Sequence, residues 1–385
     1  MNFKSLVAVL GTSISILLCA GVVHAQIKKI GVVSSSTGPV SLVGIPQKNT
    51  VALLPGKMGD FSVEYITLDD ASDPTATATA FKRLIAVEKV DAIIGPSGSP
   101  NAMGVIQFVA EAKVPLLATV GTAAVVQPMD GQKKWVFKTT QNDEIIAQAL
   151  ISHMKAAGVK SVAFMGVNDP FGENWLAVFS AMAKTAGIAI PVVERFQRGD
   201  TSVLGQTLKV MAAKPDAVLI AAAGGPAVLP HTSLVDRGYK GQIYQTHGAA
   251  LSDFLRLGKD KVEGAVLAAS LLLVLPEISD AHPSKHVAER YVKAYTDLYS
   301  AAPATFGANV YDAGLLLANA VPVAAKAGAP GTVAFRSALR EALEQTTELV
   351  GAQGVFNMTP EDHSGFDERG RELITVKDGN WSLAR

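Results

Sequence analysis

Several polar loops follow apolar runs and carry the side chains best able to contact a ligand. The loop 95–102 reads Gly-Pro-Ser-Gly-Ser-Pro-Asn-Ala and comes directly after a buried-strand pattern. Ser99 before Pro100 is typical of a helix N-cap, and the free N–H groups of a helix start favour a carboxylate or another anion. The next apolar stretch ends within the run 115–122, which offers the hydroxyl groups of Thr119 and Thr122. A plain helix cap and an ordinary Thr-rich turn are the alternatives to a ligand site.

Three further loops in the second half of the chain have the same position after an apolar run. The loop 168–172 places Phe171 at a helix start, where the ring either joins the core or faces a cleft. The loop 223–226 is glycine-rich but lacks the spacing of a phosphate-binding loop. His247 ends another run, and a single histidine is more often a structural residue than a ligand contact.

Motifs for catalysis or metal binding are missing from the sequence. It contains no G-x-G-x-x-G after the first strand, no Walker motif, no H-E-x-x-H and no G-x-S-x-G. The histidines outside the first 25 residues are not paired at metal-ligand spacing: His153, His231, His247, His282, His286 and His363. Catalysis requires a nucleophile, a base or a metal with a partner group. The sequence therefore predicts a binding protein rather than an enzyme, with no metal and no cofactor.

Composition excludes several other classes of protein. The 385 residues contain 34 basic and 34 acidic side chains, so no basic surface for nucleic acid is expected. The hydrophobic fraction of 49% is too high for a disordered chain. A single cysteine excludes a disulfide framework within the chain.

The first 25 residues have the pattern of a cleavable signal peptide. Lys4 precedes an uncharged, mostly apolar stretch from 5 to 23, and Val23-His24-Ala25 predicts cleavage before Gln26. An uncleaved membrane anchor is the alternative. Lipidation of Cys19 is disfavoured, because Leu18 stands where a small residue is needed. No later segment reaches ~18 uncharged apolar residues, so the mature chain is expected to be soluble and to reside in the periplasm of a Gram-negative cell.

Apolar runs and amphipathic stretches alternate along the rest of the chain, as in a parallel sheet covered on both faces. In the first half, strands are predicted at 30–33, 63–68, 92–95 and 115–118, with helices at 75–88 and 102–111. In the second half, strands are predicted at 161–165, 188–193, 217–222 and 242–246, with helices at 145–157, 171–186, 203–213 and 227–237. Two long helices follow at 284–299 and 309–327, and turn signals in 355–384 predict an antiparallel hairpin at a sheet edge.

The alternation restarts near residue 145 without a low-complexity linker. We therefore predict an α/β fold of two doubly wound parallel-sheet lobes joined by crossing hinge strands. Residues 26–143 plus 272–352 form lobe 1, and residues 144–271 plus 353–385 form lobe 2. Ligands of open parallel sheets bind at the carboxyl ends of the strands, so the site is expected in the cleft between the lobes.

Six short blocks in order give the chain a family resemblance. They are Thr37-Gly38-Pro39-Val40, the run 68–74, Ile94-Gly95-Pro96 with Ser99, Val114-Pro115-Leu116 with Thr122, the run 168–172, and Val262-Glu263-Gly264. With them the chain resembles the branched-chain amino acid (leucine/isoleucine/valine) binding proteins of ABC transporters over essentially its whole mature length. The resemblance implies the type I periplasmic binding fold and closure of two lobes around a solute. It also implies a membrane permease as partner, and we expect a monomer that binds no nucleic acid.

The resemblance also implies a set of ligand-binding residues. They are Val43, Ser99, Val120, Gly121, Thr122, Phe171, Ala223, Gly224 and His247. The family's carboxylate-binding serine falls on Ser99, and its backbone-and-hydroxyl pair falls on Val120 and Thr122. Two of its aromatic positions are Val43 and Ala223 here, and its ammonium-binding acid falls on His247.

These departures indicate the class of ligand. A buried ammonium group without a counter-charge is costly, and His247 cannot supply a negative charge. Smaller residues at 43 and 223 would enlarge the pocket. We therefore expect a carboxylate without an α-amino group, such as an aromatic or medium-chain organic acid. A branched-chain amino acid is the main alternative, with its acidic partner located elsewhere in the chain. A ligand-sensing receptor and a nucleotide-dependent enzyme are weaker alternatives.

Overall fold

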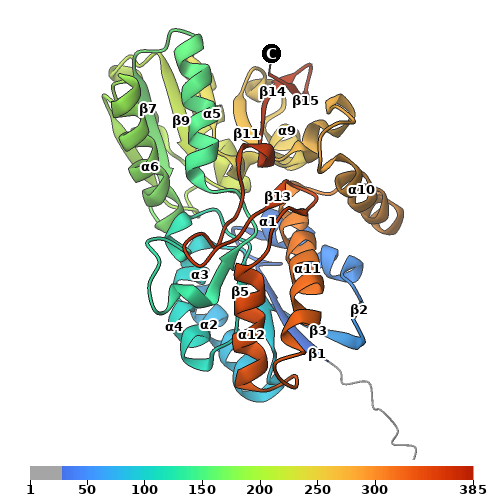
Figure 1. Cartoon of the computed structure of the whole chain (residues 1–385). Coiled ribbons are helices and arrows are strands. Elements are labelled where there is room, and N and C mark those ends of the chain that lie inside the picture. The colour runs from blue at the N-terminus through green and yellow to red at the C-terminus, as the bar shows by residue number, and fades with distance from the viewer. Residues whose placement is uncertain (1–27, 385) are drawn as a thin grey trace, which may run out of the picture.

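The computed structural model describes residues 28–384, and in it the chain forms two α/β lobes stacked end to end (Figure 1). The predicted signal peptide and Cys19 lie outside these residues. Within residues 28–384, none of the helices combines the length and the apolar character that a membrane crossing requires. The predicted fold class is confirmed, whereas the residue boundaries given for the lobes stay a prediction.

The first lobe, at the bottom of Figure 1, contains a six-stranded sheet of order β2-β3-β1-β4-β5-β6. Its strands are β1 (Lys28–Ser34), β2 (Lys57–Met58), β3 (Phe61–Asp69), β4 (Ala92–Ile94), β5 (Leu116–Ala118) and β6 (Val136–Lys138). All neighbours are parallel except β2 and β3. Its helices are α1 (Ser41–Thr50), α2 (Pro74–Arg83), α3 (Ser99–Met103), α4 (Ile106–Ala112), α11 (Thr305–Ala324) and α12 (Val333–Glu344).

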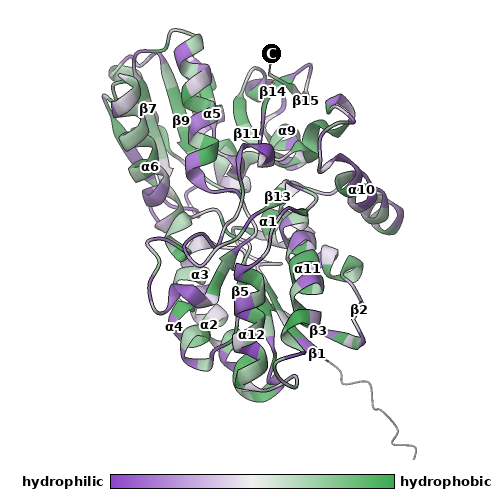
Figure 2. Cartoon of the chain, viewed as in Figure 1, coloured by the Kyte–Doolittle hydropathy of each residue, from purple (hydrophilic) through white to green (hydrophobic). Residues whose placement is uncertain are grey.

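Alternation along the strands explains why this sheet is covered on both faces. Ile94 and Leu117 point into a core with α11 and α12, whereas the adjacent Ile93 and Leu116 point into a core with α2 and α4. Successive side chains of a strand face opposite sides, so an unbroken apolar run buries both faces. Figure 2 shows this pattern, with hydrophobic strands between helices that carry their hydrophilic residues outside.

The second lobe contains a seven-stranded sheet of order β15-β14-β11-β10-β9-β7-β8. Its strands are β7 (Val162–Val167), β8 (Val193–Phe196), β9 (Ala217–Ala221), β10 (Gln242–Gln245), β11 (Val266–Ala269), β14 (Glu372–Lys377) and β15 (Asn380–Leu383). Its helices are α5 (Asp143–Ala156), α6 (Pro170–Ala186), α7 (Leu204–Ala212), α8 (Val228–Asp236) and α9 (Ser252–Gly258). The predicted edge hairpin is confirmed, because β14 is antiparallel to both β11 and β15.

Some predicted elements differ from the structure. The strand expected at 188–193 lies at β8 instead, because Pro191 has no N–H to donate to a ladder. The single helix expected at 102–111 is two helices, α3 and α4, which are separated at Gly104 and Val105. Glycine weakens a helix interior, which explains the break. Helices α1 and α12 were not predicted.

Segments that connect the lobes run between the two sheets in three places. They are residues 139–142 after β6, the stretch from β11 through α10 (Lys285–Tyr299) to α11, and the stretch from β13 (Val355–Phe356) to β14. β13 pairs with β12 (Leu349–Val350) in a small two-stranded ladder. Two of the crossings are tied together, since the Gln141 side-chain amide donates to the Gly370 carbonyl at 2.8 Å. Crossing segments between two lobes allow the lobes to rotate as rigid bodies.

Candidate functional site

A cavity lies between the lobes, where the carboxyl ends of the two sheets face each other. Strand order reverses beside β1 in one sheet and beside β7 in the other, so the loops diverge there and leave room for a ligand. The residues lining this cavity are Val40, Val43, Ser97, Ser99, Thr119, Gly121, Thr140, Phe171, Arg198, Ala223, His247, Gly248, Phe306 and Asn309. Its space is about 390 Å³, part of it open to solvent.

Six of the nine ligand residues expected from the sequence line this cavity: Val43, Ser99, Gly121, Phe171, Ala223 and His247. Val120, Thr122 and Gly224 are adjacent in sequence to lining residues but do not line it themselves. The Thr122 hydroxyl accepts the Ala124 N–H at 3.3 Å, and the Gly224 N–H donates to the Gly248 carbonyl at 2.9 Å. The structure thus brings the predicted residues to one place, and their contacts with a ligand stay a prediction.

Ser99 occupies a different position in its helix from the one expected. The predicted N-cap is wrong, because Gly98 holds the cap position and Ser99 is the first residue of α3. The helix has five residues, so its dipole adds little to an anion site. The Ser99 hydroxyl makes no hydrogen bond to the described residues and is therefore free to contact a ligand in the cavity.

Gly121 of the first lobe lies directly against the second lobe inside the cavity. A Cβ atom at this position would overlap the Phe171 ring and lie 3.0 Å from His247 Nε2. Gly121 follows β5 in the first lobe, whereas the two rings belong to the second lobe. Phe171 and His247 therefore leave no room for a side chain between Gly121 and the opposite lobe. A solute that binds between Gly121 and these rings requires the lobes to separate before it enters.

Aromatic residues surround His247. Its ring lies 5.9 Å from the Phe171 ring in an edge-on arrangement and 5.9 Å from the Trp175 ring. Burial, with a contribution from the positive charge of Lys138, lowers the pKa of His247 to about 3. The imidazole is therefore neutral near pH 7, with one ring nitrogen able to donate and the other able to accept a hydrogen bond.

An acidic residue that the sequence analysis missed lies behind this histidine. Asp143, the first residue of α5, places its Oδ1 atom 4.0 Å from His247 Nδ1. It is fully buried and does not line the cavity. Proximity in sequence could not reveal it, because α5 is about a hundred residues from His247. Asp253, which is closer to His247 in the sequence, lies in α9 and pairs with Arg256.

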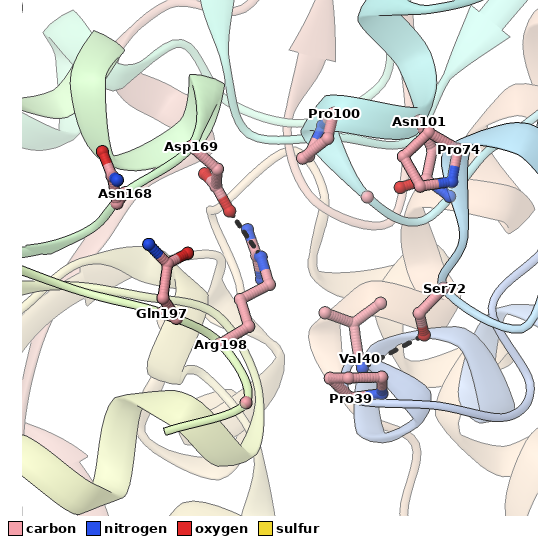
Figure 3. A pocket seen from close by; sticks show the side chains of 12 residues that line it. Pro39, Val40, Ser72, Pro74, Pro100, Asn101, Asn168, Asp169, Gln197 and Arg198 are labelled. Carbon is pink, nitrogen blue, oxygen red and sulfur yellow. Dashed lines mark hydrogen bonds and ion pairs between the residues drawn. The ribbon is translucent and has the colours of Figure 1, made fainter. Parts of the chain in front are cut away.

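Arg198 is a second charged residue that the sequence analysis missed. It follows β8 and pairs with Asp169, its Nε atom lying 2.5 Å from Asp169 Oδ2. Figure 3 shows this pair on one side of an outer cleft, opposite Val40 and Ser72 of the first lobe. The outer cleft encloses about 740 Å³, part of it open to solvent. Arg198 lines both the outer cleft and the inner cavity.

Helix α11 and one crossing segment supply three further lining residues, Phe306, Asn309 and Thr140. The Thr140 hydroxyl is buried and makes no hydrogen bond to the described residues. Phe306 also lines the cavity, so an aromatic residue is present there although Val43 and Ala223 are small. No local pattern marks these residues, because they reach the cavity from the segments that link the lobes.

Comparison with known proteins assigns the family. A model of the family described as periplasmic binding protein matches residues 28–369. The chain belongs to this family. The resemblance to ABC-transporter solute-binding proteins of the leucine/isoleucine/valine-binding type is confirmed.

Individual relatives of this periplasmic binding protein cover different shares of the chain. An extracellular ligand-binding receptor from Rhodopseudomonas palustris HaA2 is 43% identical, with a TM-score of 0.90 over 93% of this chain and 99% of its own. An R. palustris solute binding protein in complex with benzoate is 20% identical, with a TM-score of 0.76 over 93% of this chain and 95% of its own. Leu/Ile/Val-binding protein homolog 6 from Brucella abortus is 27% identical over 38% of each chain. This chain spans between 14% and 38% of the length of the curated relatives that it matches.

Proposed function

We propose that this periplasmic binding protein is the solute-binding component of an ABC importer and holds a small carboxylate without an α-amino group. The charges around the inner cavity carry the proposal. Among the described residues that line it, Arg198 and His247 are the ionisable ones, and none is an Asp or a Glu. A carboxylate can pair with the Arg198 cation and accept hydrogen bonds there, whereas none of these lining residues can supply a negative charge to an ammonium group.

The apolar part of the cavity favours a flat or linear hydrocarbon on that carboxylate. The rings of Phe171 and Phe306 line it together with Val40, Val43 and Ala223. Aromatic rings stack on or meet edge-to-face with a planar ligand, which adds to the free energy of burial. The protein in complex with benzoate has the same fold, so an aromatic acid is compatible with two lobes of this kind.

A branched-chain amino acid in the same cavity is the second candidate, and the matching Brucella Leu/Ile/Val-binding homolog favours it. It requires an acidic partner for the ammonium group. Asp143 lies behind His247, outside the lining, and Asp169 already accepts from Arg198 and from the Phe171 N–H at 2.8 Å. Both carboxylates would need to be displaced or uncovered, which is why we prefer the organic acid.

The proposed mechanism is closure of the lobes around the solute without covalent chemistry. The solute first contacts one lobe, and the other then completes the cavity. The closed form is delivered to a membrane permease. We propose an exported monomer in the periplasm for this role.

Calorimetry on the purified, ligand-stripped protein tests the ligand class. Benzoate and a panel of other aromatic and aliphatic acids are titrated beside leucine, and we expect at least one acid to bind much more tightly than leucine. His247→Glu should shift the preference toward leucine, because it restores a negative charge beside the cavity. Sub-micromolar binding of leucine, with no measurable binding of any acid, would show that the amino acid is the correct ligand.

Ser99 is expected to hydrogen-bond the carboxylate from the first lobe. A hydrogen bond to a charged group contributes ~1.5–3 kcal/mol, so Ser99→Ala should raise the dissociation constant by roughly ten- to a hundredfold. Thr122→Ala should have a smaller effect, because Thr122 does not line the cavity. The measurement is calorimetry with the tightest-binding acid of the panel. Unchanged affinity in both variants contradicts the assignment.

A further inference from the structure

A buried pair of titratable side chains lies behind the inner cavity. The exposed fractions of the His247 and Asp143 side chains are 5% and 0%, and His247 Nδ1 lies 4.0 Å from Asp143 Oδ1. Neither of these two atoms makes a hydrogen bond to the described residues. The other ring nitrogen, Nε2, faces Gly121 and the cavity. The imidazole therefore stands between a carboxylate and the space that a ligand occupies.

Other charged groups around this pair come from several elements. Lys138 of β6 is buried, and its ammonium donates to the carbonyls of Thr140 and Gln141 at 3.1 and 2.7 Å. The remaining charged groups near the pair are Glu144, which faces Asp143; Asp362, which faces Lys138; and Arg198, which lines the cavity. The Asn174 amide donates a hydrogen bond to Asp143 Oδ2, and the other carboxylate oxygen, Oδ1, faces His247.

Burial acts on both members of the pair. It lowers the pKa of His247 to about 3, and it raises the pKa of Asp143 to about 7 against the opposing effect of Lys138. Below about pH 7 Asp143 holds a proton and the pair is uncharged. Above about pH 7 the pair has released that proton, and His247 is still neutral.

We infer that Asp143 and His247 act as a proton acceptor coupled to anion binding, so that the carboxylate ligand is bound together with one proton on His247. The inference rests on the proposed function. A carboxylate oxygen at Nε2 and the Asp143 carboxylate at Nδ1 place a negative charge on each side of the ring, and both stabilise the imidazolium. Asp143 is thus a positioning residue, which keeps the charge on His247 without touching the ligand.

The proton has a different source on each side of pH 7. At pH 6 it moves from the Asp143 carboxyl to Nδ1 within the pair, so binding takes up almost no proton from solvent. At pH 8 the protein binds the carboxylate together with one proton from solvent, and in the complex this proton is on the His247 imidazole. A group whose pKa is raised by ligand binding takes up a proton when the pH lies above the pKa that the group has in the free protein. The affinity for the ligand therefore falls as the pH rises above that pKa. We therefore expect the association constant to fall by about tenfold from pH 6 to pH 8, with roughly fivefold of this fall between pH 7 and pH 8.

Calorimetry in two buffers with different ionisation enthalpies, HEPES and Tris, measures the number of protons taken up. The probe is benzoate, or the acid of the panel that binds more tightly, titrated at pH 6, 7 and 8. We expect uptake close to zero at pH 6 and approaching one at pH 8. Asp143→Asn keeps an acceptor for the Asn174 amide, and it should abolish the uptake and flatten the pH dependence. His247→Gln should do the same, which provides a second variant if the first fails to fold.

His153→Gln is the matched control, because this half-buried histidine contacts Tyr244 at 2.8 Å away from the cavity. It should keep the uptake of the unmodified protein. Acid binding without proton uptake at pH 8, or unchanged uptake in Asp143→Asn, overturns the inference and leaves the proposed function standing. Failure of every acid to bind overturns the proposed function, and the inference with it.

Discussion

Replacing Arg198 with Gln is expected to weaken the binding of an aromatic or aliphatic acid by about 30- to 1000-fold, which corresponds to ~2–4 kcal/mol. Arg198 is the one permanent cation among the described residues that line the inner cavity. Its Nε–H is used by Asp169, whereas the two terminal NH₂ groups of the guanidinium make no hydrogen bond to the described residues. These groups can bind a carboxylate with two parallel hydrogen bonds, which glutamine cannot reproduce. The substitution also leaves Asp169 without its counter-charge beside the anionic ligand.

Arg195→Gln is the matched control for this prediction. Arg195 lies three residues away, pairs with Glu173 and is 43% exposed, outside both interlobe spaces. Exposed ion pairs contribute ~0–1 kcal/mol, so the control should keep nearly the full affinity. Calorimetry on both variants measures the affinity for the acid, and thermal unfolding verifies that both are folded. Together they separate the loss of a ligand contact from a loss of stability. Equal affinities for Arg198→Gln and the unmodified protein would exclude Arg198 as a ligand contact.

Adding a side chain at Gly121 is expected to block closure while leaving each lobe folded. The atoms nearest to a Cβ at this position all belong to Phe171 and His247 of the opposite lobe, so the clash arises only when the lobes meet. Overpacking of a tight contact costs ~1–3 kcal/mol and sometimes more. Gly121→Ala should weaken acid binding at least tenfold, and Gly121→Val by about a hundredfold or more.

Small-angle scattering checks this mechanism directly. The unmodified protein should become more compact when saturated with the acid, whereas Gly121→Val should keep the larger radius of gyration at the same ligand concentration. Gly225→Ala is the control, because its Cβ would meet only Leu42 Cδ1 across the cleft, at an ordinary 3.8 Å. Compaction of Gly121→Val on ligand addition, with unchanged affinity, would be incompatible with closure at this contact. Identical curves with and without ligand for the unmodified protein would indicate a rigid molecule.

Much of the fold could be predicted from the chain without its structure. Apolar runs such as Ala92–Ile94 and Ala217–Ala221 are buried on both faces, and this local property identifies strands of parallel sheets. The edge hairpin was predictable because Asp378-Gly379 is a residue pair typical of tight turns between two strands. In the structure both residues have the positive φ angles that such a turn requires. Helix α1 was harder to predict, since Pro46 lies inside it and weakens the helical pattern.

The sequence also predicted which residues follow the strands and therefore lie near the site. Ser99, Phe171, Ala223 and His247 each follow a strand within a few residues, and the carboxyl ends of parallel strands share one edge of the sheet. The absence of catalytic and metal-binding motifs from the sequence predicted binding rather than catalysis. Sequence alone thus determined the fold class, the family resemblance and the region of the cleft.

Only the tertiary structure decided which charges meet in that cleft. Arg198, Asp143 and Phe306 are brought to His247 from three elements far apart in the chain, by the packing of two lobes whose relative position no local pattern encodes. Hydrogen bonds reach only about 3 Å, and Coulombic attraction weakens with the distance between the charges. The partners of a charged group therefore depend on the three-dimensional path of the chain rather than on spacing along it. The titration of His247 likewise depends on burial, which a residue acquires only when its surroundings are assembled.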